Sequence, residues 1–132
     1  MTNRKILLAL KKIEVSYADG YVIEALIANY HLNLNLLRFI CSVSETIMFK
    51  EEKKVKNLII QLSAEIDSNQ KLKTIISKKN LKFFKVWLSK TEVYFKTLKY
   101  KLPANTKSLF LETQKITGIL NISVNKIIAT NK

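Results

Sequence analysis

Four polar side chains on one line of a predicted helix have the residue types that acid–base chemistry needs. Glu24, His31, Asn35 and Arg38 recur at helical spacing inside the apolar stretch 20–49, and this histidine is the only one in the chain. Seven residues separate Glu24 from His31 and His31 from Arg38, whereas direct pairing on a helix needs a separation of three or four. A general base would also need a nucleophile or oxyanion donors, and the sequence offers neither. We therefore expect a polar seam that forms hydrogen bonds between packed helices or within a dimer.

Metal and cofactor sites find no support in the sequence. One histidine, one cysteine and scattered carboxylates provide no Glu-x-x-His pair, and two glycines are too few for a phosphate-cradling loop. We predict no metal and no cofactor. Cys41 falls on the apolar side of its helix, which is typical of a buried, reduced thiol in a cytoplasmic protein.

The lysines are concentrated in the second half of the chain. Residues 1–70 carry a net charge of +1, whereas residues 71–132 hold fourteen Lys and two Glu, a net charge of +12. Such asymmetry favours a polyanionic partner, either a nucleic acid (RNA or DNA) or an acidic protein. Against this, the chain has 21 Lys but only 2 Arg, a bias that A/T-rich coding could produce, and Arg is the better phosphate ligand.

One predicted helix carries the lysines that could form a nucleic-acid-binding face. Between Lys71 and Lys101 aromatic residues are interleaved with the basic ones, and Trp87, Tyr94 and Tyr100 are the candidates for exposed stacking surfaces. The alternative is a solvated lysine face whose long stems cover an aromatic core. The candidate lysines are Lys78, Lys79, Lys82, Lys85, Lys96 and Lys99.

The chain is predicted to be all-α and a single domain, 1–132, in an antiparallel bundle of four to five helices. Apolar residues recur at helical spacing nearly throughout, and two Gly and one Pro allow few sharp turns. A first helix over 3–19, capped by Thr2 or Asn3, should end at a left-handed Gly20. A long, buried second helix then occupies 20–49 and packs against it as a hairpin.

Three further long helices and one short helix complete the predicted bundle. Glu51 and Glu52 suit the positive end of a third helix, which stops at the polar cluster 67–69 and is followed by a short helix before Asn80. A helix over 81–102, capped by Asn80, ends before Pro103. The last helix is capped by Asn105 or Thr106, and Gly118 inside it suggests a close helix crossing. The expected buried positions of these helices are Val55, Leu58, Ile59, Leu62, Ile66, Leu72, Ile75, Ile76, Phe84, Leu88, Thr91, Phe95, Leu98, Leu102, Leu109, Ile116, Leu120, Val124 and Ile127.

No segment is predicted to enter a membrane. The longest charge-free stretch, 25–37, contains three Asn and one His and falls short of a span. The apolar run 6–10 is too short for the core of a signal peptide. We expect a cytoplasmic protein.

A Gly-aromatic turn followed by Glu-Ala on the second helix, in the segment Asp19-Gly20-Tyr21-Val22-Ile23-Glu24-Ala25, resembles the HEPN superfamily of small helical bundles. The later Leu37-Arg38-Phe39 adds to this resemblance, which covers mainly residues 5–45. It implies a four- or five-helix up-down bundle, frequent dimerisation, and roles beside nucleotidyltransferases, in toxin–antitoxin systems or as ribonucleases. Nuclease members carry an Arg, then four to six intervening residues, then a His. Neither Arg4 nor Arg38 has a His at that spacing, so no catalytic residue is carried over.

The sequence thus predicts a non-catalytic helical interaction module, a homodimeric scaffold or a partner of another protein. With the HEPN resemblance, an antitoxin-like or nucleotidyltransferase-associated role follows. The first alternative is nucleic-acid binding through the lysine-rich helix. The second is a ribonuclease with an atypical site at His31 and Arg38.

Overall fold

The chain folds into helices joined by short turns in the computed structural model, which describes residues 2–44 and 54–130. Within these ranges there are six α-helices, one short 3₁₀-helix and no strand, so the all-α prediction is confirmed. The helix number exceeds the predicted four to five because the short α4 is a separate element. The elements are α1 (Asn3–Ala18), α2 (Val22–Ile40), η1 (Cys41–Val43), α3 (Val55–Glu65), α4 (Gln70–Ile75), α5 (Lys78–Leu98) and α6 (Thr106–Thr130).

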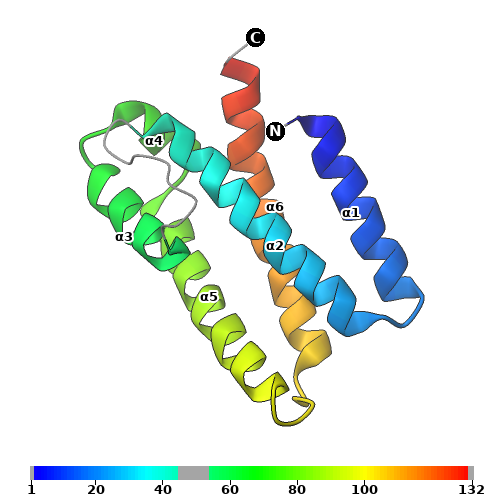
Figure 1. Cartoon of the computed structure of the whole chain (residues 1–132). Helices are drawn as coiled ribbons and strands as arrows, with labels where there is room; N and C mark the ends of the chain where they lie inside the picture. Colours follow the sequence, from blue (N-terminus) through cyan, green and yellow to red (C-terminus); the bar gives the residue numbers. More distant parts are fainter. Residues whose placement is uncertain (1, 45–53, 131–132) are drawn as a thin grey trace.

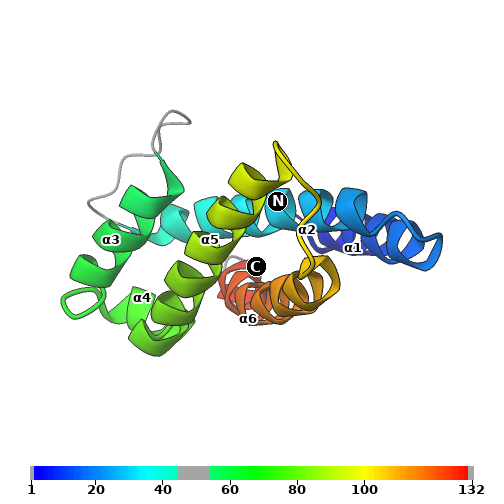
Figure 2. The same ribbon diagram turned by 90° about the horizontal axis from the view of Figure 1, so that it is seen from below.

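The two helices at the centre are α2 and α6, which cross each other (Figure 1). On one side α1 runs antiparallel to α2, and on the other α5 runs antiparallel to α6. The smaller helices lie beyond α5, with α3 packed on α5 and α4 on α6 (Figure 2). This order leaves α6 in contact with α2 and with α5 on different faces, which matters for the surfaces described below.

The turn between α1 and α2 is closed by Gly20 as predicted. Its φ of 89° is left-handed, a conformation that an L side chain rarely adopts. The amide of Gly20 donates to the carbonyl of Tyr17 (3.1 Å) and that of Tyr21 to the carbonyl of Ser16 (2.9 Å). These two bonds form a Schellman motif, which satisfies the last carbonyls of α1. At the other end, Thr2 caps α1 by accepting from the amide of Lys5.

The second helix is shorter than the sequence predicted. It ends at Ile40, passes through η1, and Ser44 then adopts an extended conformation with ψ of 140°. The hydroxyl of Ser44 donates to Glu65 Oε1 (3.0 Å), which directs the chain toward α3. The rest of the predicted helix, 45–49, and the expected helix start at 51–52 lie outside the described residues.

The fifth helix begins and ends earlier than expected. Ser77, rather than Asn80, is the N-cap, because its side chain accepts from the Asn80 amide (3.1 Å) while its own backbone is extended. The helix stops at Leu98, well before Pro103. Leu102, expected in the core, therefore lies beyond the helix and is 68% exposed.

Most predicted core positions are buried. Those of α3, α4 and α6 are all buried, as are Phe84, Leu88 and Thr91 of α5. Phe95 and Leu98 pack against the core from half-buried positions. Gly118 does not mark a close crossing, since it is exposed and a Cβ there would meet nothing within 4 Å.

A buried polar cluster joins α2, α5 and α6 at the centre of the core. The Thr117 hydroxyl accepts from Asn29 Nδ2 and donates to Asn33 Oδ1, both at 2.6 Å. Asn33 Nδ2 donates to the carbonyl of Thr113 (3.1 Å), and Trp87 Nε1 donates to the hydroxyl of Thr113 (2.8 Å). All five side chains are at most 4% exposed. Because buried polar groups are costly without partners, these bonds fix how the three helices pack.

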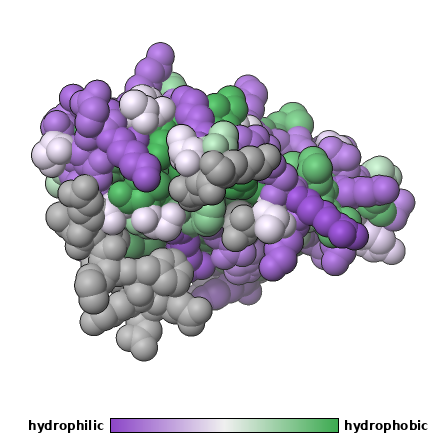
Figure 3. All heavy atoms as spheres, turned by 90° about the horizontal axis from the view of Figure 1, so that it is seen from above, coloured by the Kyte–Doolittle hydropathy of each residue, from purple (hydrophilic) through white to green (hydrophobic). Residues whose placement is uncertain are grey.

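The described surface is largely polar. Seen from above, hydrophilic residues make up most of the coloured surface, with some apolar residues exposed between them (Figure 3). Among the helices of the described residues, none combines the length and hydropathy that crossing a membrane would require.

Candidate interaction surface

The predicted polar seam lies on the outside of α2. Glu24, His31 and Asn35 are exposed and Arg38 is half-buried. Arg38 Nη1 donates to Asn35 Oδ1 at 3.5 Å, a long hydrogen bond, and within the described ranges neither Glu24 nor His31 has a hydrogen-bond or ion-pair partner. Among the described residues the seam therefore does not connect packed helices, and its role between two copies stays a prediction.

An aromatic contact lies beside this seam. Tyr30 is half-buried, with its ring edge-on to His31 (centroids 5.5 Å apart) and to Phe95 of α5 (5.1 Å). Burial raises the pKa of the Tyr30 phenol, the carboxylate of Glu92 raises it further, and the Arg38 charge opposes the shift. A Tyr phenol is already neutral around pH 7 at its ordinary pKa, and a raised pKa keeps it so.

Metal-binding groups do not gather on the described part of the chain. No cluster of three or more His, Cys, Asp or Glu side chains occurs there. Cys41 is buried where α2 passes into η1, at the apolar position that the sequence indicated.

The six predicted lysines of α5 are all exposed, but they divide between two faces. Five of them, Lys78, Lys82, Lys85, Lys96 and Lys99, lie on one line of the helix, which between Lys85 and Lys96 is continued by Ser89 and Glu92. Lys79 lies on a different line, with its Nζ 5.9 Å from the centre of the Phe83 ring. Lys78 pairs with Asp67, and the hydrogen bond from this lysine lowers the pKa of that carboxyl.

Two of the three aromatic residues expected at the surface are in the core instead. Trp87 is fully buried and bonded to Thr113, and Tyr94 is 2% exposed, with its hydroxyl 2.8 Å from Thr106 Oγ1. The reason is that α5 packs against both α3 and α6, so that its buried face is wider than one seam. Tyr100, beyond the end of α5, is 90% exposed.

The feature that sequence reasoning missed is a hollow between α5 and α6, which we call the α5–α6 valley. Its main part has a volume of about 790 Å³. Three of its apolar residues are about half exposed: Phe83 (50%), Val86 (53%) and Leu111 (52%). The residues that line this part are Phe83, Val86, Lys90, Ser108, Leu111, Glu112, Lys115, Ile116 and Ile119.

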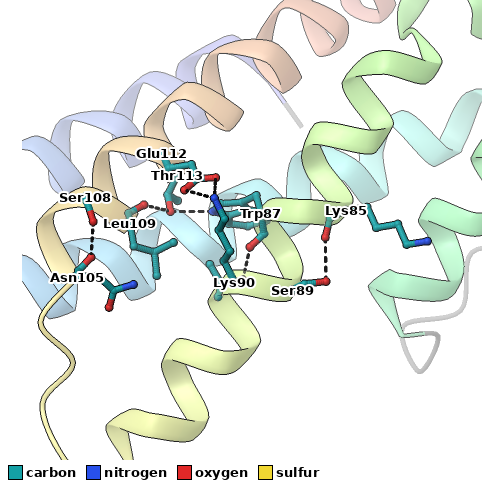
Figure 4. Close-up of polar contacts among 10 residues, drawn as sticks. Lys85, Trp87, Ser89, Lys90, Asn105, Ser108, Leu109, Glu112 and Thr113 are labelled. Atoms are coloured by element: carbon teal, nitrogen blue, oxygen red, sulfur yellow. Dashed lines mark hydrogen bonds and ion pairs between the residues drawn. The ribbon is translucent and has the colours of Figure 1, made fainter.

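A polar bridge and a buried bond connect the two sides of the valley. Lys90 reaches from α5 to the carboxylate of Glu112 on α6, at 3.1 and 3.3 Å (Figure 4). Beside this ion pair, the indole of Trp87 donates to Thr113 on the same two helices (Figure 4). The two helices that form the valley are thus joined by a hydrogen bond in the core and by an ion pair at the surface.

The valley extends at both ends into adjoining hollows. Toward the start of α5 it shares Ile119 with a hollow of about 200 Å³ that also contains Ile122 and Lys126. Toward the end of α5 it shares Lys90 with a hollow of about 490 Å³ that also contains Val93. The three hollows together follow much of the length of α5.

The sequence contains a signal for this surface. On α5, Lys79, Phe83, Val86 and Lys90 recur at steps of three and four, on a line outside the predicted core seam. Apolar residues that recur outside the core stripe of a helix indicate a second contact surface.

Comparisons of the chain with protein-family models, with curated proteins and with solved structures found no match.

Proposed function

We propose that this chain is a non-catalytic interaction module that binds a helical segment of another protein in the α5–α6 valley. The observation that carries the proposal is the half-exposed apolar floor of the valley, formed by Phe83, Val86 and Leu111. Contiguous apolar surface of this kind is a frequent mark of protein-binding sites.

The shape of the valley suits a helix. Two antiparallel helices present a trough between them, and an amphipathic helix lays its apolar face into such a groove through residues at i, i+3 or i+4, and i+7. The distance along α5 from Lys79 to Val93 is roughly 21 Å at about 1.5 Å per residue. A bound helix of about 14 residues would span that length.

The proposal is tested with a synthetic helix that carries no charge. A peptide of about 14 residues, with leucines at i, i+3, i+4 and i+7 and glutamine elsewhere, is labelled and titrated in fluorescence anisotropy. Val86→Glu should abolish saturable binding because it places a carboxylate in the valley floor. Leu8→Glu, at an equally exposed leucine of α1 (53%), is the matched control and should leave binding unchanged.

Two results would count against the proposal that the valley binds a helix. The first is an absence of saturable binding by the wild-type chain. The second is equal loss of binding in both variants, which would mean that the peptide adheres to exposed apolar residues without distinction. Circular dichroism of each variant establishes that it is folded.

Nucleic-acid binding is the second candidate, favoured by the exposure of all six predicted lysines of α5. Such binding would be largely electrostatic, because Trp87 and Tyr94 are not available for stacking. An RNA and DNA shift assay across a salt series should then show steep weakening as salt rises. The triple variant Lys82→Gln, Lys85→Gln, Lys96→Gln should weaken it further, and undetectable binding at low salt would end this candidate.

Three other proposals follow from the sequence alone. A homodimer should sediment as a species twice the chain mass of 15.3 kDa. An antitoxin-like or nucleotidyltransferase-associated role rests on the HEPN resemblance, and its natural test is co-expression with such an enzyme. A ribonuclease at His31 and Arg38 would cleave structured RNA and lose that activity in His31→Ala.

A further inference from the structure

The α5–α6 valley has a strongly one-sided charge. Its main part and the two adjoining hollows contain one carboxylate, Glu112, and this group is already paired with Lys90. The lysines that line the three hollows are Lys73, Lys90, Lys101, Lys115 and Lys126.

These positive charges lie on both sides of an apolar floor. On the α5 side Lys79 lies over the ring of Phe83, next to the main hollow. On the α6 side Lys115 lines the main hollow and Lys126 the hollow beyond it. A ligand in the valley would therefore bury apolar groups along its middle and meet ammonium groups along both edges.

We propose, on the basis of the function proposed above, that the partner is an acidic amphipathic helix. Its apolar stripe would lie on Phe83, Val86 and Leu111, and Asp or Glu on both sides of the stripe would meet the lysines. Exposed ion pairs each contribute little to the binding affinity. Their main effects are selection among amphipathic helices and faster association, through complementary potential.

The floor of the valley favours a protein over a nucleic acid as the polyanion. Val86, Leu111 and Ile119 are aliphatic and offer no flat ring on which a base could stack. The one aromatic ring of the floor, Phe83, already has the ammonium of Lys79 over it. Phosphate oxygens need neighbouring donors but gain nothing from apolar area, whereas an amphipathic helix uses both parts of this surface.

The test compares three labelled peptides that share one leucine stripe and differ only at the flanking positions. These positions carry glutamine, glutamate or lysine. At about 50 mM salt the glutamate peptide should bind the wild-type chain about tenfold more tightly than the glutamine peptide, and the lysine peptide more weakly than either. At about 300 mM salt the advantage of the glutamate peptide should largely disappear, because screening shortens the reach of the lysine charges.

Matched charge reversals locate the effect. Lys115→Glu, inside the valley, should weaken the glutamate peptide about fivefold or more while leaving the glutamine peptide nearly unchanged. Lys96→Glu, on the other exposed line of α5, changes the net charge equally and should leave both peptides unchanged. Equal effects of the two reversals would overturn the proposal, because the preference would then reflect net charge alone.

The remaining outcomes separate this inference from the proposed function. If the glutamine peptide binds at least as well as the glutamate peptide, the acidic partner is wrong while the valley remains a binding site. If no peptide binds, both fail. If unlabelled RNA displaces the glutamate peptide and Lys115→Glu abolishes RNA binding, the valley is a nucleic-acid site and the acidic helix is overturned.

Discussion

Helix α6 buries some polar side chains in the core and exposes some apolar ones at the valley. It buries the hydroxyl of Thr117 toward α2 and that of Thr113 toward α5. At the valley it exposes Leu111 (52%) and Ile122 (60%). On the buried face every hydroxyl has a partner on another helix or on its own backbone. The contrast shows that partner groups, rather than polarity alone, decide which residues a helix buries. The apolar residues on the open face lack such a partner within the described chain.

The largest effect on stability should come from the buried polar cluster that α6 forms with α2 and α5. Asn33→Ala removes the acceptor of Thr117 and the donor to the Thr113 carbonyl, both in the dry core. We expect a loss of about 2–4 kcal/mol in the free energy of unfolding, from unpaired groups and a small cavity. Urea titration followed by circular dichroism measures it. Asn35→Ala, exposed on the same helix, is the control, and equal losses in the two variants would contradict the importance of the cluster.

Thr113→Val tests the same face with almost no change of volume. Valine keeps the shape but leaves Trp87 Nε1 without its acceptor, at a cost of about 1–3 kcal/mol. Because Trp87 is the only tryptophan, its emission should also shift to shorter wavelength. Thr97→Val, which loses only a bond to its own helix, should cost less than about 0.5 kcal/mol. An unchanged emission and stability for Thr113→Val would show that this bond is dispensable.

On the open face, adding atoms should stabilise the chain. Gly118→Ala places a Cβ in open space within α6, and we expect a gain of up to about 1 kcal/mol from helix propensity. Gly20→Ala is a matched opposite, since its Cβ also meets nothing but its φ is 89°. The midpoint temperature of thermal unfolding should therefore rise for Gly118→Ala and fall for Gly20→Ala. A loss for Gly118→Ala would mean that this face is more closely packed than described.

The smallest effect on stability is expected at Leu111, an exposed apolar residue of the valley. Leu111→Gln on the open face should change stability by no more than about 0.5 kcal/mol, because half of the side chain is already in water. The same variant should weaken binding of the leucine-striped peptide. A loss of stability above about 1 kcal/mol would place Leu111 with the core residues rather than with a binding surface.

Helical periodicity was sufficient to predict much of the fold. It located the buried positions of α3, α4 and α6, and local chemistry located the turn at Gly20. The end of α2 was missed because Ser44 is held by Glu65, far along the chain. Periodicity does not reveal such a distant partner.

The polar core and the valley were missed for a related reason. Asn29 and Asn33 resemble the surface residues of any helix until Thr117 is brought to them. Trp87 looks accessible until its indole donates a hydrogen bond to Thr113. The valley exists only when α5 and α6 are side by side. The lysines of α5 were placed correctly at the surface, because long charged side chains rarely need a partner to be stable there.

The buried cluster also constrains the order in which the chain can fold. Asn29 and Asn33 are 88 and 84 residues away from the threonine that satisfies them. During synthesis, which proceeds from the N-terminus, α1 and α2 emerge long before that threonine. The α1–α2 hairpin can form early through its local turn, but the polar groups on its inner face stay hydrated until α6 docks. Closure of the core is therefore a late step. It depends on contacts between residues far apart in the sequence, and such contacts form slowly.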